Sequence, residues 1–148
     1  YIEEDKKRAV MKPFYVKYLS ELEKSFTDFL DNSGKIEWWF KNGDRDETFF
    51  AVPYNDNKTS FYVDFIVKFK DGKIGLFDPH GTQFSDFGPK SDGLQKYIKS
   101  ERKKGKNLFG GLVTNTDQVN YNGRWVYFTE NSEKFKKGEF KNWEDLEL

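Results

Sequence analysis

Two aspartates in neighbouring apolar segments are the residues best suited to chemistry. Asp64 interrupts an alternating apolar run that extends from Phe61 to Phe69, and Asp78 closes the next run, which begins at Lys73. A buried carboxylate is costly unless it is paired, protonated or bound to a metal. Two carboxylates that meet at the end of paired strands can share a divalent cation, Mg²⁺ or Mn²⁺. Asp64 and Asp78 are therefore the candidate metal ligands.

The turn between the two runs decides whether these aspartates meet. The dipeptide Asp71-Gly72 is typical of a tight β-hairpin turn. If the loop has two residues, Phe65 lies across from Asp78, and Asp64 points to the other face of the sheet. In that arrangement the two carboxylates cannot share an ion.

A three-residue loop over residues 70–72 is the alternative. Its third residue is a glycine, and this type of loop needs a positive φ at that position. We expect this loop, with Phe69 paired to Ile74 and with Asp64 opposite Asp78 on the same face. The two carboxylates would then be close enough to hold one ion.

His80, the single histidine, follows Asp78 by two positions. Both side chains face the same way if the backbone stays extended past Pro79, which cannot donate a ladder hydrogen bond and should end the strand. A histidine here could act as a base, a metal ligand or a hydrogen-bonding residue. His80 is therefore a candidate catalytic residue, and a structural role is the alternative.

Glu23 is the third candidate acid. Ser20 is a plausible helix N-cap, and Glu23 follows it at the capping-box spacing, in a helix predicted to run to about Leu30. Glu23 lies at the edge of the apolar stripe of this helix. It could therefore cap the helix, point toward the aspartates, or do both.

A basic helix is predicted from Pro89 to about Lys104. Its lysines could hold a phosphate backbone beside the carboxylates, or they could form a solvated face. The candidate nucleic-acid contacts on this helix are Lys90, Gln95, Lys96 and Lys99.

Composition narrows the class of protein. The chain has 148 residues, which fits one domain, and it contains no cysteine, so it has neither disulfides nor thiolate metal sites. Its formal net charge is zero, which argues against a basic footprint over the whole protein. No apolar run is long enough to cross a membrane, and no signal peptide is evident, so we expect a cytoplasmic protein. No phosphate-binding loop for ATP is present.

The remaining pattern predicts an α/β (α+β) fold with a mixed central sheet flanked by helices. Residues 1–18 read as a linker or a leading helix, and the chain begins at Tyr1, which suggests a piece of a longer polypeptide. Trp143 and Leu146 should dock the tail on the body. Further strands are predicted at residues 35–41, 48–54 and 108–114, with a last hairpin of residues 119–121 and 124–129 around Asn122-Gly123.

This order of elements resembles the PD-(D/E)xK nuclease superfamily. More closely, it is similar to the C-terminal nuclease-like domain of the restriction subunits of type III restriction enzymes and related DEAD/DEAH-box helicases. The similarity spans roughly residues 13 to 115. The matching segments are Glu23-Lys-Ser-Phe26, Trp38-Trp-Phe-Lys-Asn-Gly43, Tyr62-Val-Asp-Phe-Ile-Val67 and Leu76-Phe-Asp-Pro-His-Gly81.

The resemblance implies that residues 1–148 are one metal-dependent DNA endonuclease domain at the end of a helicase or restriction subunit. Glu23, Asp64 and Asp78 match the acids that bind Mg²⁺ in that superfamily. His80 stands where the superfamily has lysine, which departs from its pattern. The implied partners are DNA, the helicase domain of the parent chain, and a methyltransferase or specificity subunit.

Two other functions fit the same fold. The domain could be a DNA-binding module whose site is weakened by His80, or a structural module that docks on its parent helicase. Metal binding would separate the nuclease from both alternatives. Salt-dependent DNA binding would separate the two alternatives from each other.

Overall fold

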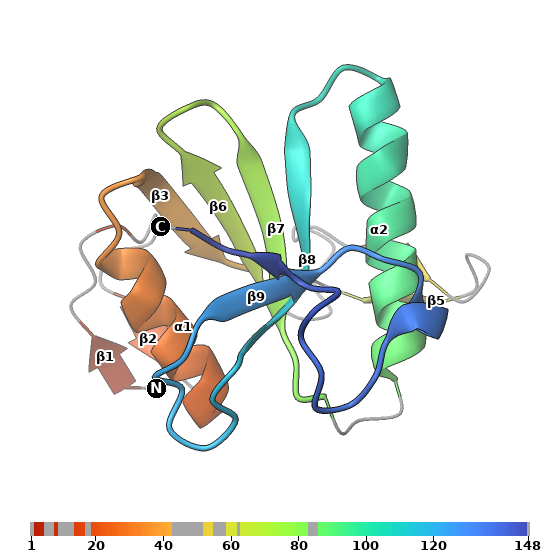
Figure 1. Ribbon diagram of the computed structural model, residues 1–148. Coiled ribbons are helices and arrows are strands. Elements are labelled where there is room, and N and C mark those ends of the chain that lie inside the picture. Colours follow the sequence, from red (N-terminus) through yellow and green to blue (C-terminus); the bar gives the residue numbers. More distant parts are fainter. Residues whose placement is uncertain are drawn as a thin grey trace.

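A mixed six-stranded sheet forms the centre of the molecule (Figure 1). The computed structural model describes residues 2–4, 8, 14–16, 19–42, 52–54, 59–61, 63–82 and 86–147. The strands, in their order across the sheet, are β10 (Glu144–Asp145), β9 (Trp125–Phe128), β8 (Leu108–Asn115), β7 (Ile74–Pro79), β6 (Phe65–Phe69) and β3 (Ile36–Lys41). Strands β7 and β8 run parallel, and the other neighbouring pairs are antiparallel. The predicted α+β fold with a mixed, helix-flanked sheet is confirmed.

Helices α1 (Glu21–Asp31) and α2 (Phe87–Lys103) cover opposite faces of this sheet. The buried stripe of α1, including Phe26 and Leu30, packs on one aromatic face. The other face packs against the stripe of α2, which includes Leu94 and Ile98. The helix α2 starts two residues earlier than predicted, because Pro89 is tolerated within the first turn, where its missing N–H has no helical partner.

Two small hairpins accompany the sheet. Strand β1 (Ile2–Glu4) pairs with β2 (Phe14–Val16), so the alternative of a leading helix over residues 1–18 is wrong, and the linker alternative stays a prediction. Strand β4 (Val52–Tyr54) pairs with β5 (Thr59–Phe61). The rest of the strand expected at 48–54 lies outside the described residues.

The central hairpin has the expected three-residue loop. Phe69 accepts a hydrogen bond from the Gly72 N–H at 3.0 Å, and Gly72 has φ 98°. The register pairs Phe65 with Phe77, so the next position places Asp64 opposite Asp78, as predicted. The expected pairing of Phe69 with Ile74 is wrong, because Ile74 pairs with Lys68, one residue further along.

The strand expected to run from Phe61 to Phe69 is divided. Phe61 belongs to β5, and β6 begins only at Phe65, after a bend at Asp64. Asp64 ends the regular strand ladder of β6, since its carboxylate contacts Lys41 and its N–H donates to the Asp78 carboxylate. This break puts Asp64 at the end of the sheet, outside its buried centre.

The last hairpin also differs from its prediction. Strand β9 pairs with β8, and residues 119–121 form no strand. The carboxylate of Asp117 accepts the backbone N–H groups of Val119 at 3.0 Å, Asn120 at 3.0 Å and Asn122 at 3.4 Å. These bonds fold residues 116–123 into a loop. The tail docks as predicted, with Trp143 and Leu146 both buried.

Gly72 provides a stability test of the hairpin. We expect Gly72→Ala to lower the free energy of unfolding by about 1 kcal/mol, because alanine resists a positive φ. The matched control is Gly34→Ala. Neither site has an atom within 4 Å of the added Cβ, and Gly34 has no positive φ. Chemical denaturation of both variants tests this, and equal stabilities would contradict the assigned turn.

Candidate functional site

The charged residues of interest come from segments that meet at one end of the sheet, where β7 ends and α1 and α2 begin, the lower end in Figure 1. Strands β7 and β8 are parallel, so their carboxyl ends meet there, and such an edge commonly forms a ligand crevice. Helices α1 and α2 both begin at this end. Three of these residues come from α1 and the strand ends: Glu23 from α1, Lys41 from β3 and Asp64 just before β6. The other four are Asp78 at the end of β7, His80 just after β7, and Asp86 and Lys90 at the start of α2.

Asp64 and Asp78 contact each other directly. The backbone N–H of Asp64 donates to Oδ1 of Asp78 at 3.3 Å, and Asp78 is 5% exposed. Burial, the charge of Asp64 and a hydrogen bond between the two side chains raise the pKa of Asp78 well above its usual range. The charge of Lys90 acts in the opposite direction but is outweighed. Asp78 therefore tends to keep its proton beside Asp64.

Glu23 caps its own helix and lies within electrostatic range of Asp64. Ser20 Oγ accepts the Glu23 N–H at 3.1 Å, and Glu23 Oε1 accepts the Ser20 N–H at 3.3 Å, which completes the capping box. Burial, followed by the negative charge of Asp64, raises the pKa of Glu23. Lys41 and Ser20 lower it in part. The helix cap thus belongs to the same electrostatic cluster as the aspartates.

Lys41 is a member of the site that the sequence argument missed. Its Nζ lies 3.1 Å from Oδ1 of Asp64 and 5.6 Å from the ring centroid of Phe65. The register that pairs Lys41 with Phe65 brings the end of β3 beside the start of β6. The Asn42 N–H also donates to the backbone carbonyl of Asp64 at 2.7 Å. Only strand pairing reveals this contact, and the sequence does not specify which strand pairs with which.

His80 is held by the backbone of Gly81 and by the side chain of Asp86. Its Nδ1 lies 2.6 Å from the carbonyl of Gly81, which can only accept, so Nδ1 carries a hydrogen. Its Nε2 lies 3.0 Å from Oδ1 of Asp86. The buried ring meets Phe87 edge-on, with centroids 5.6 Å apart. Asp78 and His80 face the same side of the sheet, as predicted, because Asp78 is in register with Leu112, which packs on the α2 side with Phe87, the residue that the His80 ring contacts.

Asp86 links His80 to Lys90. The Lys90 Nζ lies 3.2 Å from Oδ2 of Asp86, whose other oxygen meets His80. Burial alone would raise the pKa of Asp86, but hydrogen bonds and charge from Lys90 and His80 lower it on balance. The sequence argument missed Asp86. Its spacing from Lys90, one helical turn at the start of a predicted helix, is the signal that could have identified it.

A cleft of about 580 Å³ opens between these elements. Glu23 lies on one side, and His80, Asp86 and Lys90 lie on another. Tyr121, from the loop after β8, also lines it and holds a positive φ of 57°. Asp64 and Asp78 are not part of its wall. The Asp64 side chain is 27% exposed, so it is the more accessible of the two aspartates.

The four predicted nucleic-acid contacts separate into three groups. Lys90 lines the cleft. Gln95 is buried, and its Nε2 donates to the carbonyls of Gly110 at 2.8 Å and Phe128 at 3.1 Å, so the prediction that Gln95 contacts DNA is wrong. Lys96 and Lys99 are exposed, but at about 1.5 Å per residue they lie about 9 and about 14 Å further along α2 than Lys90.

The fold and its charged end define an α+β domain with a candidate ligand cleft at the end of a mixed sheet. The chain belongs to the YagJ family, whose model matches residues 7–119. No curated protein and no solved structure matches the chain significantly. No comparison links it to the PD-(D/E)xK nucleases or to restriction enzymes. Among the described residues, no helix is long and apolar enough to cross a membrane.

The raised pKa of Asp78 makes stability depend on pH. Above about pH 4, the usual pKa of a carboxyl group, the folded state binds more protons than the unfolded state, so stability falls as pH rises. Asparagine mimics the protonated acid and does not titrate. We expect Asp78→Asn to melt a few degrees above wild type at neutral pH, and the two melting temperatures to converge toward about pH 4.

Thermal melts over this pH range test the expectation. Glu37→Gln is the control, because it removes one exposed carboxylate from β3 and should leave the melting curve close to wild type. An Asp78→Asn protein no more stable than wild type at neutral pH would contradict the account of the pair.

Proposed function

We propose that this domain is a divalent-cation-dependent phosphodiesterase that acts on DNA, as an endonuclease does. The observation that carries the proposal is the direct contact of Asp64 with buried Asp78, beside Glu23, at the carboxyl end of β7. Crowded carboxylates of this kind repel one another, and a bound cation would relieve the repulsion. The electrostatic cluster thus favours binding of a positive ion.

The donor set fits an ion that is shared with substrate. Within the described residues, no group of three or more histidine, aspartate and glutamate side chains is placed to hold a metal alone. Mg²⁺ commonly binds one or two carboxylates together with water and substrate phosphates, which matches the pair Asp64 and Asp78. When bound, such an ion polarises a phosphoryl oxygen and lowers the pKa of bound water.

The other charged groups suit a phosphodiester substrate. Lys90 presents an ammonium group in the wall of the cleft, where it can bind a phosphate oxygen. Glu23, whose pKa is raised by burial and by Asp64, is better matched than an ordinary carboxylate to accept a proton from water near neutral pH. Asp86 holds His80 and Lys90 in fixed positions.

One contact favours a second candidate function, a DNA-binding module that does not cleave. Lys41 already provides a cation 3.1 Å from Asp64, so an internal ion pair partly takes the place of a bound metal. His80 stands where the nucleases that the sequence resembles have a lysine, and both of its ring nitrogens already contact Gly81 and Asp86. On this alternative, the domain binds DNA in a salt-dependent manner and leaves it intact.

The experiment that tests the proposal is cleavage of supercoiled plasmid with Mg²⁺ or Mn²⁺. We expect wild type to nick or linearise the plasmid, and Asp64→Ala to reduce the rate on the order of a hundredfold or more, because a metal ligand is removed. Glu37→Gln, purified in parallel, should cleave at the wild-type rate and controls for contaminating nucleases.

Three results distinguish the candidates. Metal-dependent cleavage that is lost in Asp64→Ala supports the phosphodiesterase. DNA binding that weakens with salt, without cleavage under either metal, supports the binding module. Cleavage that persists unchanged in Asp64→Ala would contradict a role for the aspartate pair.

A further inference from the structure

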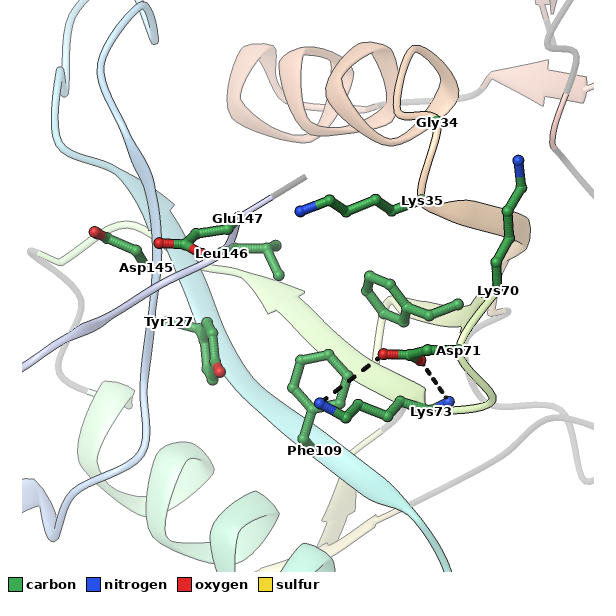
Figure 2. A pocket seen from close by; sticks show the side chains of 11 residues that line it. Gly34, Lys35, Lys70, Asp71, Lys73, Phe109, Tyr127, Asp145, Leu146 and Glu147 are labelled. Atoms are coloured by element: carbon green, nitrogen blue, oxygen red, sulfur yellow. Dashed lines mark hydrogen bonds and ion pairs between the residues drawn. The ribbon is translucent and has the colours of Figure 1, made fainter.

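A second pocket is lined by residues at the opposite end of the sheet from the cleft. Figure 2 shows this pocket from close by. Its volume is about 520 Å³, within the range of small-molecule sites. Helix α1 ends at Asp31, so the part of its face of the sheet beyond this residue is not covered by the helix. The pocket is bounded by the start of β3, the turn between β6 and β7, and residues 145–147. None of these segments belongs to the charged cleft.

Aromatic rings form the floor of this pocket. The Phe109 ring lies 5.2 Å from Phe69 and 5.9 Å from Tyr127, measured between centroids. Phe109 and Tyr127 are only partly buried, so ring surface faces the pocket. Partly exposed aromatic rings provide a platform on which a planar aromatic group can stack.

Two lysines lie beside this floor. Figure 2 shows Lys35 reaching across the pocket from the start of β3, and Lys73 lying along the floor beside Phe109. The Lys73 Nζ is 6.0 Å from the Phe109 ring centroid. A group bound by this ammonium and a ring stacked on Phe109 can therefore belong to the same small molecule.

The charges around the pocket favour an anion. Asp145 is engaged by Arg124 in an ion pair. Asp71 lies 4.0 Å from Lys73, an exposed and weak pair. Among the described residues, the ammonium of Lys35 makes no ion pair, although it faces the pocket. With Lys70 also on the rim, three lysines stand against Glu147, which makes no ion pair among the described residues, and the weakly paired Asp71.

We infer that this pocket binds a nucleotide, with the base stacked on Phe109 and edge-on to Tyr127, whose ring is inclined by 67° to that of Phe109, and with the phosphate between Lys35 and Lys73. Lysine ammonium groups bind phosphate as point charges, and a base stacks on aromatic rings with little dependence on its sequence. The inference does not rest on the phosphodiesterase proposal, because the two sites share no residue.

Calorimetric titration at low salt with AMP, adenosine and inorganic phosphate tests the inference. AMP carries both the ring and the anion, so it should bind saturably, and each half should bind at least tenfold more weakly. The double variant Lys35→Gln/Lys73→Gln should weaken AMP binding tenfold or more and leave adenosine binding nearly unchanged. Lys136→Gln/Lys137→Gln removes two exposed lysines elsewhere and should bind AMP as wild type does.

Chemical-shift mapping locates the site, and a short oligodeoxyadenylate identifies the source of the nucleotide. Shifts at Phe109 and Tyr127 are expected with AMP. An oligonucleotide that displaces AMP and binds more tightly would assign the pocket to a nucleic-acid strand, and one that does not would assign it to free nucleotide. The inference is overturned by the absence of saturable AMP binding, by unchanged affinity in the lysine double variant, or by shifts confined to the cleft.

Discussion

The repulsion between Asp64 and Asp78 is the constraint on which the charged end of this domain depends. The three-residue turn at residues 70–72 sets the register, and the register forces the two aspartates together. Burial then raises the pKa of Asp78, because two negative charges at this place are unfavourable unless a proton or a cation neutralises one of them. Much of the surrounding structure supplies positive charge toward this pair.

Two elements provide that compensation from different directions, and a third adds to the negative charge. Strand β3 brings Lys41 to Asp64, and α2 brings Lys90 within electrostatic range of Asp78. The start of α1 adds a further acid, Glu23, which also caps its own helix. An arrangement with one extra carboxylate and two flanking lysines is costly for a purely structural role. It suits a site that takes up a cation together with an anionic substrate.

The elements with strong local signals were predictable from the sequence, and the contacts between distant strands were not. Ser20 and Glu23 define a helix start, and the glycine at 72 defines a turn, because both depend on nearby backbone geometry. The loop after β8 was mistaken for a strand, since the bonds to Asp117 are not visible in the apolar pattern. Lys41 was missed because its role depends on which strands pair.

The fate of the second helix illustrates the same limit. Its basic composition is evident in the sequence, but the sequence does not specify which of its polar residues point toward the sheet. Gln95 lies on the buried side, where it joins two backbone carbonyls of the sheet, whereas Lys90 reaches the cleft. Membership of the YagJ family states which proteins the chain is related to and assigns no chemistry to the site.

A titration with paramagnetic Mn²⁺, followed by NMR, tests the central claim most directly. If Asp64 and Asp78 bind a divalent cation, the amide signals of residues 63–65, 77, 78 and 80 should broaden first. This broadening should disappear in Asp64→Asn/Asp78→Asn. Selective broadening at these residues would support the site without requiring any substrate. Broadening that centres elsewhere, or that survives in the double variant, would contradict it.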